Sequence, residues 1–72
     1  SLMEQVVIAL LLLVNNQITE ARLQPDLSSC LKGKRQASRN TSSSIEYRCI
    51  KTKAELEKNI DGSYSIKKLI LE

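Results

Sequence analysis

Nine consecutive apolar residues, from Val6 to Val14, dominate the first part of this 72-residue chain. The run has the length of a signal-peptide core, about 7 to 15 residues, and is shorter than the roughly 20 residues of a transmembrane helix. Asn15, Asn16 and Gln17 follow it, and Thr19-Glu20-Ala21 then offers small residues suited to cleavage, although no Lys or Arg precedes the run. We therefore expect residues 1–21 to form an apolar N-terminal helical segment that acts as a secretory signal peptide.

Two alternatives for the same run keep it in the folded protein. The first is a helix that packs on a partner and ends before Pro25, because apolar residues recur at spacings of four and three. These residues are Val7, Leu11, Val14, Ile18 and Ala21. The second is a buried strand, which a run of Val, Ile and Leu also permits. Either alternative would make the whole chain one folded unit.

The first residues carry a resemblance to a known family. Ser1-Leu2-Met3-Glu4 followed by an apolar stretch is similar to the amino terminus of mature type IV pilins and pseudopilins. The resemblance covers about fourteen residues and implies a long apolar helix that packs with other copies in a filament. The chain departs from that pattern at Asn15-Asn16-Gln17, which interrupts the apolar stretch.

A chain this small is expected to need a covalent cross-link for a stable fold. Residues 22–72 contain no Phe or Trp and only two aromatic residues, Tyr47 and Tyr64. Apolar burial in so short a segment barely offsets the conformational entropy lost on folding. Cys30 and Cys49 allow a single intramolecular disulfide, and closing a loop of roughly 20 residues is worth on the order of 3 kcal/mol. The disulfide would place the protein in an oxidising, secreted or periplasmic compartment.

Residues 22–72 are expected to form a small disulfide-stapled α+β domain. Asp26 to Ala37 has a helical pattern, and Ile45 to Cys49 alternates as a half-buried strand does. The composition of Lys53 to Asn59 favours a short helix over a continued strand. Tyr64 to Leu71 predicts a final strand with a bulge at Lys67-Lys68. The predicted fold is thus an N-terminal apolar helix, then a small helix and a two-to-three-stranded antiparallel sheet.

The residue types argue against catalysis. The chain has no His, which is the commonest general base and metal ligand near neutral pH. It has no Cys-x-x-Cys motif, and its two glycines cannot form a phosphate-binding loop. We therefore expect no enzyme activity, no cofactor and no metal site.

The charge pattern suggests one binding surface. The net charge is +3, and four basic residues lie within eight positions without an acidic residue among them. They are Lys32, Lys34, Arg35 and Arg39. Such a cluster is a candidate site for an anionic partner, but the absence of nearby stacking aromatics makes nucleic acid an improbable one.

Taken together, these features predict a small exported, non-catalytic binding protein of bacterial or phage type that meets a protein partner or itself. One alternative is a pilin-like structural subunit assembled through the N-terminal helix. The other is a basic module that binds an anionic surface through residues 32–39.

Overall fold

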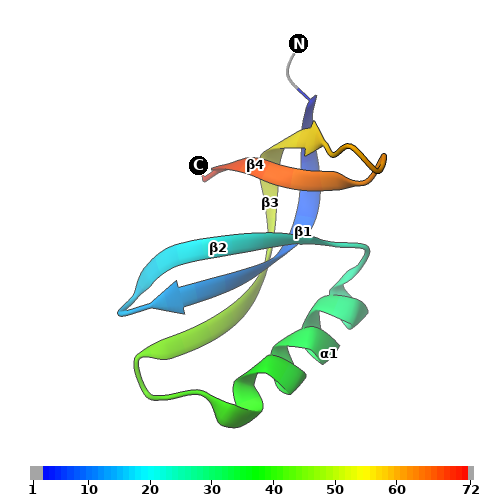
Figure 1. Ribbon diagram of the computed structural model, residues 1–72. Coiled ribbons are helices and arrows are strands. Elements are labelled where there is room, and N and C mark those ends of the chain that lie inside the picture. The colour runs from blue at the N-terminus through cyan, green and yellow to red at the C-terminus, as the bar shows by residue number, and fades with distance from the viewer. Residues whose placement is uncertain (1–2, 72) are drawn as a thin grey trace.

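The computed structural model describes residues 3–71, which form a four-stranded antiparallel sheet and one α-helix. The strands are β1 (Met3–Val14), β2 (Gln17–Gln24), β3 (Ile45–Lys58) and β4 (Tyr64–Ile70). Helix α1 (Leu27–Ala37) continues into a short 3-10 helix, η1 (Ser38–Asn40). The strand order is β2-β1-β3-β4, so the two long strands lie at the centre (Figure 1). None of the helices in residues 3–71 has the length and apolar character needed to cross a membrane.

The apolar run forms the central strand β1, so the predicted N-terminal helix is wrong. Asn15 and Asn16 have φ values of 51° and 66°, and Val14 pairs with Gln17 across them. Two successive positive φ angles are typical of the two-residue turn that matches the twist of a β-hairpin, and Asn tolerates them better than most residues. The pilin-like helix is equally absent from residues 3–14, while Ser1 and Leu2 lie outside the described residues. The alternative of a buried strand agrees with the structure.

Strand β1 is apolar at consecutive positions because both of its faces are covered. Ala9, Leu11 and Leu13 are buried on one face, here called the core face, where Ile66 and Leu69 of β4 pack against them. Leu10 is buried on the opposite face, here called the helix face, beneath α1. A strand covered on both sides needs apolar residues on both, as in buried parallel sheets. This requirement removes the polar alternation that would have marked the run as a strand.

The sheet is strongly twisted, and its two short strands lie at opposite corners. Strand β2 pairs with the C-terminal part of β1, whereas β4 pairs with the C-terminal part of β3. Because of the twist, β4 and β2 lie on the same side of the two central strands (Figure 1). They are in contact although they are not neighbours in the sheet. The sheet is therefore curled around its core like a half-open barrel.

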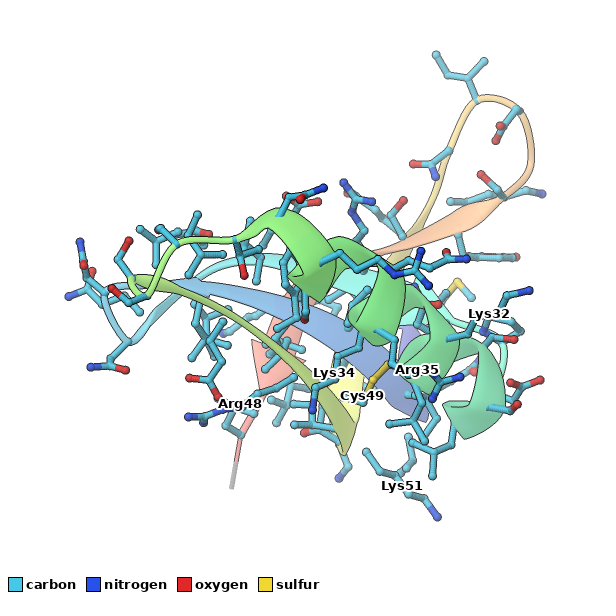
Figure 2. The ribbon with its side chains drawn as sticks, turned by 90° about the horizontal axis from the view of Figure 1, so that it is seen from below. Lys32, Lys34, Arg35, Arg48, Cys49 and Lys51 are labelled. Carbon is cyan, nitrogen blue, oxygen red and sulfur yellow. A yellow bond between two sulfur atoms is a disulfide. The ribbon has the colours of Figure 1, made fainter. Side chains whose placement is uncertain are left out.

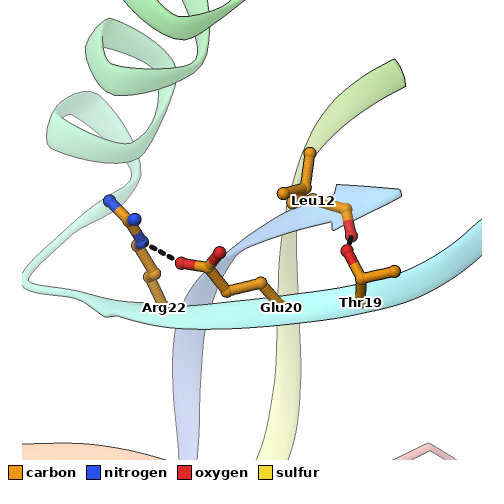
Figure 3. A network of polar contacts seen from close by, with 4 residues as sticks. All are labelled: Leu12, Thr19, Glu20 and Arg22. Carbon is orange, nitrogen blue, oxygen red and sulfur yellow. Dashed lines mark hydrogen bonds and ion pairs between the residues drawn. The ribbon is translucent and has the colours of Figure 1, made fainter. Parts of the chain in front are cut away.

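Two bulges adjust the short strands to the long ones. In β2 the extra residue is Thr19, whose hydroxyl donates a 3.2 Å hydrogen bond to the Leu12 carbonyl (Figure 3). In β4 the pairing passes from Lys68 to Ile66 and leaves Lys67 as the extra residue, which confirms the predicted bulge. This bulge keeps both Ile66 and Leu69 against the core.

Helix α1 is confirmed, and so is the disulfide that fastens it to the sheet. The Asp26 carboxylate caps the helix by accepting a 2.7 Å hydrogen bond from the Ser29 backbone N–H. Cys30 is the only buried residue of α1, and it is bonded to Cys49 of β3 across a Cα–Cα distance of 6.0 Å. A disulfide is compatible with an oxidising, extracytoplasmic location.

The short helix predicted for Lys53 to Asn59 is also wrong, because β3 continues as a strand to Lys58. Ala54 and Leu56 are buried on the core face, and each is paired with β1 on one side and β4 on the other. Pairing on both sides outweighs the weak helix preference of the local composition. The protein is thus mostly antiparallel sheet, with less helix than the predicted α+β fold.

Candidate functional site

Strand β1 extends beyond the end of β2 and leaves one side of its first residues uncovered. Gln24, the last residue of β2, pairs with Ile8. Residues Met3 to Val7 pair with β3 on one side, from Leu56 to Thr52, and with no strand of residues 3–71 on the other. We call Met3–Val7 the β1 free edge.

The backbone groups that point outward from this edge can be identified from the hairpin. The Asn15 N–H donates a 2.9 Å hydrogen bond to the Ser44 carbonyl, on the β3 side. Because the hydrogen-bonding direction alternates along an antiparallel strand, the odd-numbered residues of β1 bond to β3 and the even-numbered ones face the other way. At the β1 free edge the N–H and C=O groups of Glu4 and Val6 therefore point away from the sheet.

The β1 free edge differs from the other sheet edges in its charges. Unpaired edges usually carry Lys, Arg or other devices that prevent pairing with another chain. The outer part of β3 carries Arg48 and Lys51, and β4 carries Lys67 and Lys68. On β2, Arg22 forms an ion pair with Glu20, which raises the pKa of Arg22 (Figure 3). The β1 free edge has no basic residue and only one charged residue, Glu4.

An apolar groove of about 720 Å³ runs beside the β1 free edge. This volume lies in the range of protein ligand sites, about 300 to 1,000 Å³. Three of its large side chains remain partly exposed: Val6 at 60%, Tyr64 at 41% and Met3 at 36%. Its other apolar lining includes Val7, Leu23 and Leu56, and the polar residues Lys51 and Gln24 also line it. The groove places apolar surface next to unpaired backbone groups.

The four basic residues singled out in the sequence do not form one compact site. Lys32 and Arg35 are three residues apart on α1 and share a side of the helix, and Arg39 follows in η1. Lys34 lies on a different side of the helix (Figure 2), and its positive charge affects the pKa of Glu46 on β3. The pKa of Glu46 is lowered, chiefly by a hydrogen bond from Arg48 and to a smaller extent by Lys34. The basic charge is thus spread around the helix.

A second hollow, of about 460 Å³, lies between α1 and β2. Leu10, Leu12 and Tyr47 line it together with the Glu20–Arg22 ion pair. The charge of Arg22 is already balanced by Glu20, so this hollow is a weaker candidate for a ligand site than the groove beside β1.

The sequence has no His, and both cysteines are joined in the disulfide. Within residues 3–71, no three His, Cys, Asp or Glu side chains come together as a candidate metal site. Comparison of the chain with known protein families, with curated proteins and with solved structures finds no match. The function is therefore inferred from the geometry of the molecule.

The β1 free edge was missed at the sequence level, although two signals point to it. Asn15-Asn16 marks the hairpin turn, and Pro25 comes directly after the end of β2. The arm after the turn is therefore short, whereas the apolar and β-branched residues before the turn continue further. The residues by which the first arm exceeds the second in length form the β1 free edge.

Proposed function

We propose that this protein is a non-catalytic protein-binding module of an oxidising, extracytoplasmic compartment. It binds an extended polypeptide segment, which adds to the sheet at the β1 free edge. The observation that carries this proposal is an edge without basic residues directly beside an apolar groove. Strand addition of this kind takes its affinity from main-chain hydrogen bonds and its specificity from pockets for alternate side chains.

The register of the sheet defines what such a segment contacts. Its backbone bonds to the outward N–H and C=O groups of Glu4 and Val6. Every second side chain lies on the core face, beside Leu23 and Leu56 of the groove. The intervening side chains lie on the helix face, near Lys51. The preferred segment therefore alternates apolar residues with polar or acidic ones.

The disulfide and the composition support the remaining parts of the proposal. A structural disulfide persists in secreted and periplasmic proteins, whereas cytosolic reductants keep most thiols reduced. A chain without His lacks the usual partner of a Ser or Cys nucleophile.

Selection of peptides from a random library against the immobilised protein tests the binding function. We expect enriched peptides with alternating apolar residues, and we expect Val6→Pro to weaken their binding at least about tenfold. Proline at position 6 removes an outward N–H and leaves the bonds to β3 in place. Ala21→Pro is the matched control, because it places a proline on the outer edge of β2 instead. Failure to enrich any peptide, or equal binding by the Val6→Pro variant, would refute strand addition at this edge.

Thiol trapping in cells of the native host tests the compartment. Rapid alkylation without reductant should leave Cys30 and Cys49 unmodified. Alkylation of both residues in unreduced cells would place the protein in a reducing compartment and contradict this part of the proposal.

A further inference from the structure

We infer that the segment bound at the β1 free edge is the same edge of a second copy of this protein. Two copies form a symmetric dimer with Gln5 on the twofold axis, and their sheets join into one sheet of eight strands. This inference rests on the proposed strand addition and names its partner.

The length of the β1 free edge fixes the register of such a dimer. Its described residues run from Met3 to Val7, because the structure describes the chain from Met3 onward and Ile8 is already paired with Gln24. A symmetric antiparallel pair that uses the whole edge is centred on its middle residue, Gln5. Met3 of one copy then lies opposite Val7 of the other, and Glu4 lies opposite Val6.

This register satisfies the outward backbone groups. Glu4 and Val6 are the residues whose N–H and C=O groups point away from β3, and the register sets them opposite each other. Each such pair exchanges two N–H···O=C bonds, so both pairs together use every outward group of the two edges. Gln5 faces its symmetry mate in the closely spaced, non-hydrogen-bonded position, where the two side-chain amides can bond to each other.

Neighbouring registers are less favourable. An axis on Glu4 places two carboxylates directly opposite each other, and like charges in that position are destabilising. An axis on Val6 requires a partner for Ile8 on the side that Gln24 already occupies. The Gln5 register avoids both problems.

Side-chain contacts also favour a second copy as the partner. Opposite residues of an antiparallel pair share a face, so Met3 and Val7 of the second copy lie on the core face, beside the apolar groove. There they cover the exposed apolar surface of Met3 and Tyr64. Only Glu4 is charged in this edge, and the register keeps the two Glu4 side chains from lying directly opposite each other. The edge thus matches itself in hydrogen bonding and brings no two charges directly opposite each other.

Measuring molar mass by light scattering over a range of concentrations tests the dimer. The wild-type chain should approach twice its 8.1 kDa mass as the concentration rises. Val6→Glu places a carboxylate directly opposite Glu4 of the other copy in both hydrogen-bonded pairs and should raise the dimer dissociation constant at least about tenfold. Ile18→Glu, at the far end of the hairpin, is the matched control and should dimerise as the wild type does.

Cross-linking provides a test of the register that is independent of affinity. The Cα atoms of a closely spaced antiparallel pair lie about 4.5 Å apart, which is within the range of a disulfide. Gln5→Cys should therefore give a covalent dimer on mild oxidation, whereas Gln17→Cys, beside the hairpin turn, should not.

Three outcomes overturn the inference. They are a monomer at all concentrations, a dimer that Val6→Glu leaves intact, and equal cross-linking of the two cysteine variants. If the protein stays monomeric while selected peptides bind at β1, the dimer is refuted and strand addition stands. If neither a dimer nor peptide binding is found, both proposals fall.

Discussion

Removal of the disulfide should unfold α1 while most of the sheet stays folded. Cys30 is the only buried residue of the helix, and Leu27 and Leu31 on the same helix are exposed at 51% and 37%. An isolated helix of 11 residues is marginal in water, so α1 depends on its attachment to β3. The core residues Ala9 and Leu11 lie on the opposite face of the sheet, away from the helix.

The size of the effect follows from the loop that the disulfide closes. Cys30 and Cys49 are 19 residues apart, and in the chain-entropy model a loop of that length contributes on the order of 3 kcal/mol. A chain of 72 residues has a total stability of about 4 to 11 kcal/mol. With a urea m-value of about 1 kcal/mol per M for so small a protein, the midpoint should fall by about 3 M. The sheet should therefore remain folded in the absence of denaturant.

The variant Cys30→Ala/Cys49→Ala separates these effects without leaving reactive thiols. Urea unfolding followed by circular dichroism gives the change in stability, and amide hydrogen exchange gives its location. We expect the amides of residues 27–37 to lose protection and those of residues 9–13 to keep it. Equal protection in α1 and β1 would show that packing, and not the disulfide, holds the helix in place, and the reasoning would be refuted.

Three further substitutions test local features of the fold. Gly33→Ala should raise the free energy of unfolding by about 0.5 to 1 kcal/mol in urea titrations, because the added Cβ would lie 3.6 Å from Leu10 Cδ2, an ordinary contact, and alanine favours the helix. A loss of stability would show that α1 needs the closer approach. Asn16→Ala should lower the same quantity by about 1 kcal/mol, and Asn16→Gly should not, because position 16 has a φ of 66°; equal stability of the two variants would contradict the turn assignment. The Ser29 backbone N–H lowers the pKa of the Asp26 carboxyl, so the folded state binds its proton less readily than the unfolded state. The stabilisation from Asp26 is complete above its unfolded pKa of about 3.9 and is lost as the pH falls through the folded pKa. Thermal unfolding from pH 7 to pH 2 should show a smaller acid destabilisation for Asp26→Asn, and an unchanged pH profile would exclude this contribution.

The parts of the fold that the sequence predicted correctly have local causes. The cap at Asp26 and the apolar spacing after it are sufficient to define α1. The slip of the alternating pattern at Lys67 predicted the bulge in β4. The even number of cysteines predicted the disulfide. Each of these signals depends only on a few neighbouring residues.

The errors concern segments whose structure is decided by distant neighbours. Every position from Val6 to Val14 is apolar, so periodicity cannot distinguish a helix from a strand there. The turn at Asn15-Asn16 was the distinguishing feature, since two positive φ angles connect β1 directly to β2. For Lys53 to Lys58 the deciding factor is pairing with both β1 and β4, which no local composition reveals.

The candidate site was harder to predict than the fold. Proximity in sequence grouped Lys32, Lys34, Arg35 and Arg39, but a helix turns successive residues in different directions, and the charge of Lys34 contributes to lowering the pKa of Glu46. The β1 free edge results from a difference in length between two paired strands. That difference becomes visible only when the turn and both strands have been assigned.

The position of β1 in the sheet leads to a final prediction about the mature protein. Cleavage after Ala21, which the sequence suggests, would remove β1 and most of β2. Strand β1 is paired with both β2 and β3, and it supplies Ala9, Leu10, Leu11 and Leu13 to the buried interior. Since β3 and β4 would then be left as a hairpin without their core, we expect the folded protein in its native host to retain residues 3–21. The intact mass of the purified protein decides the question, because a folded, disulfide-bonded species that begins at Arg22 would contradict the central role of β1.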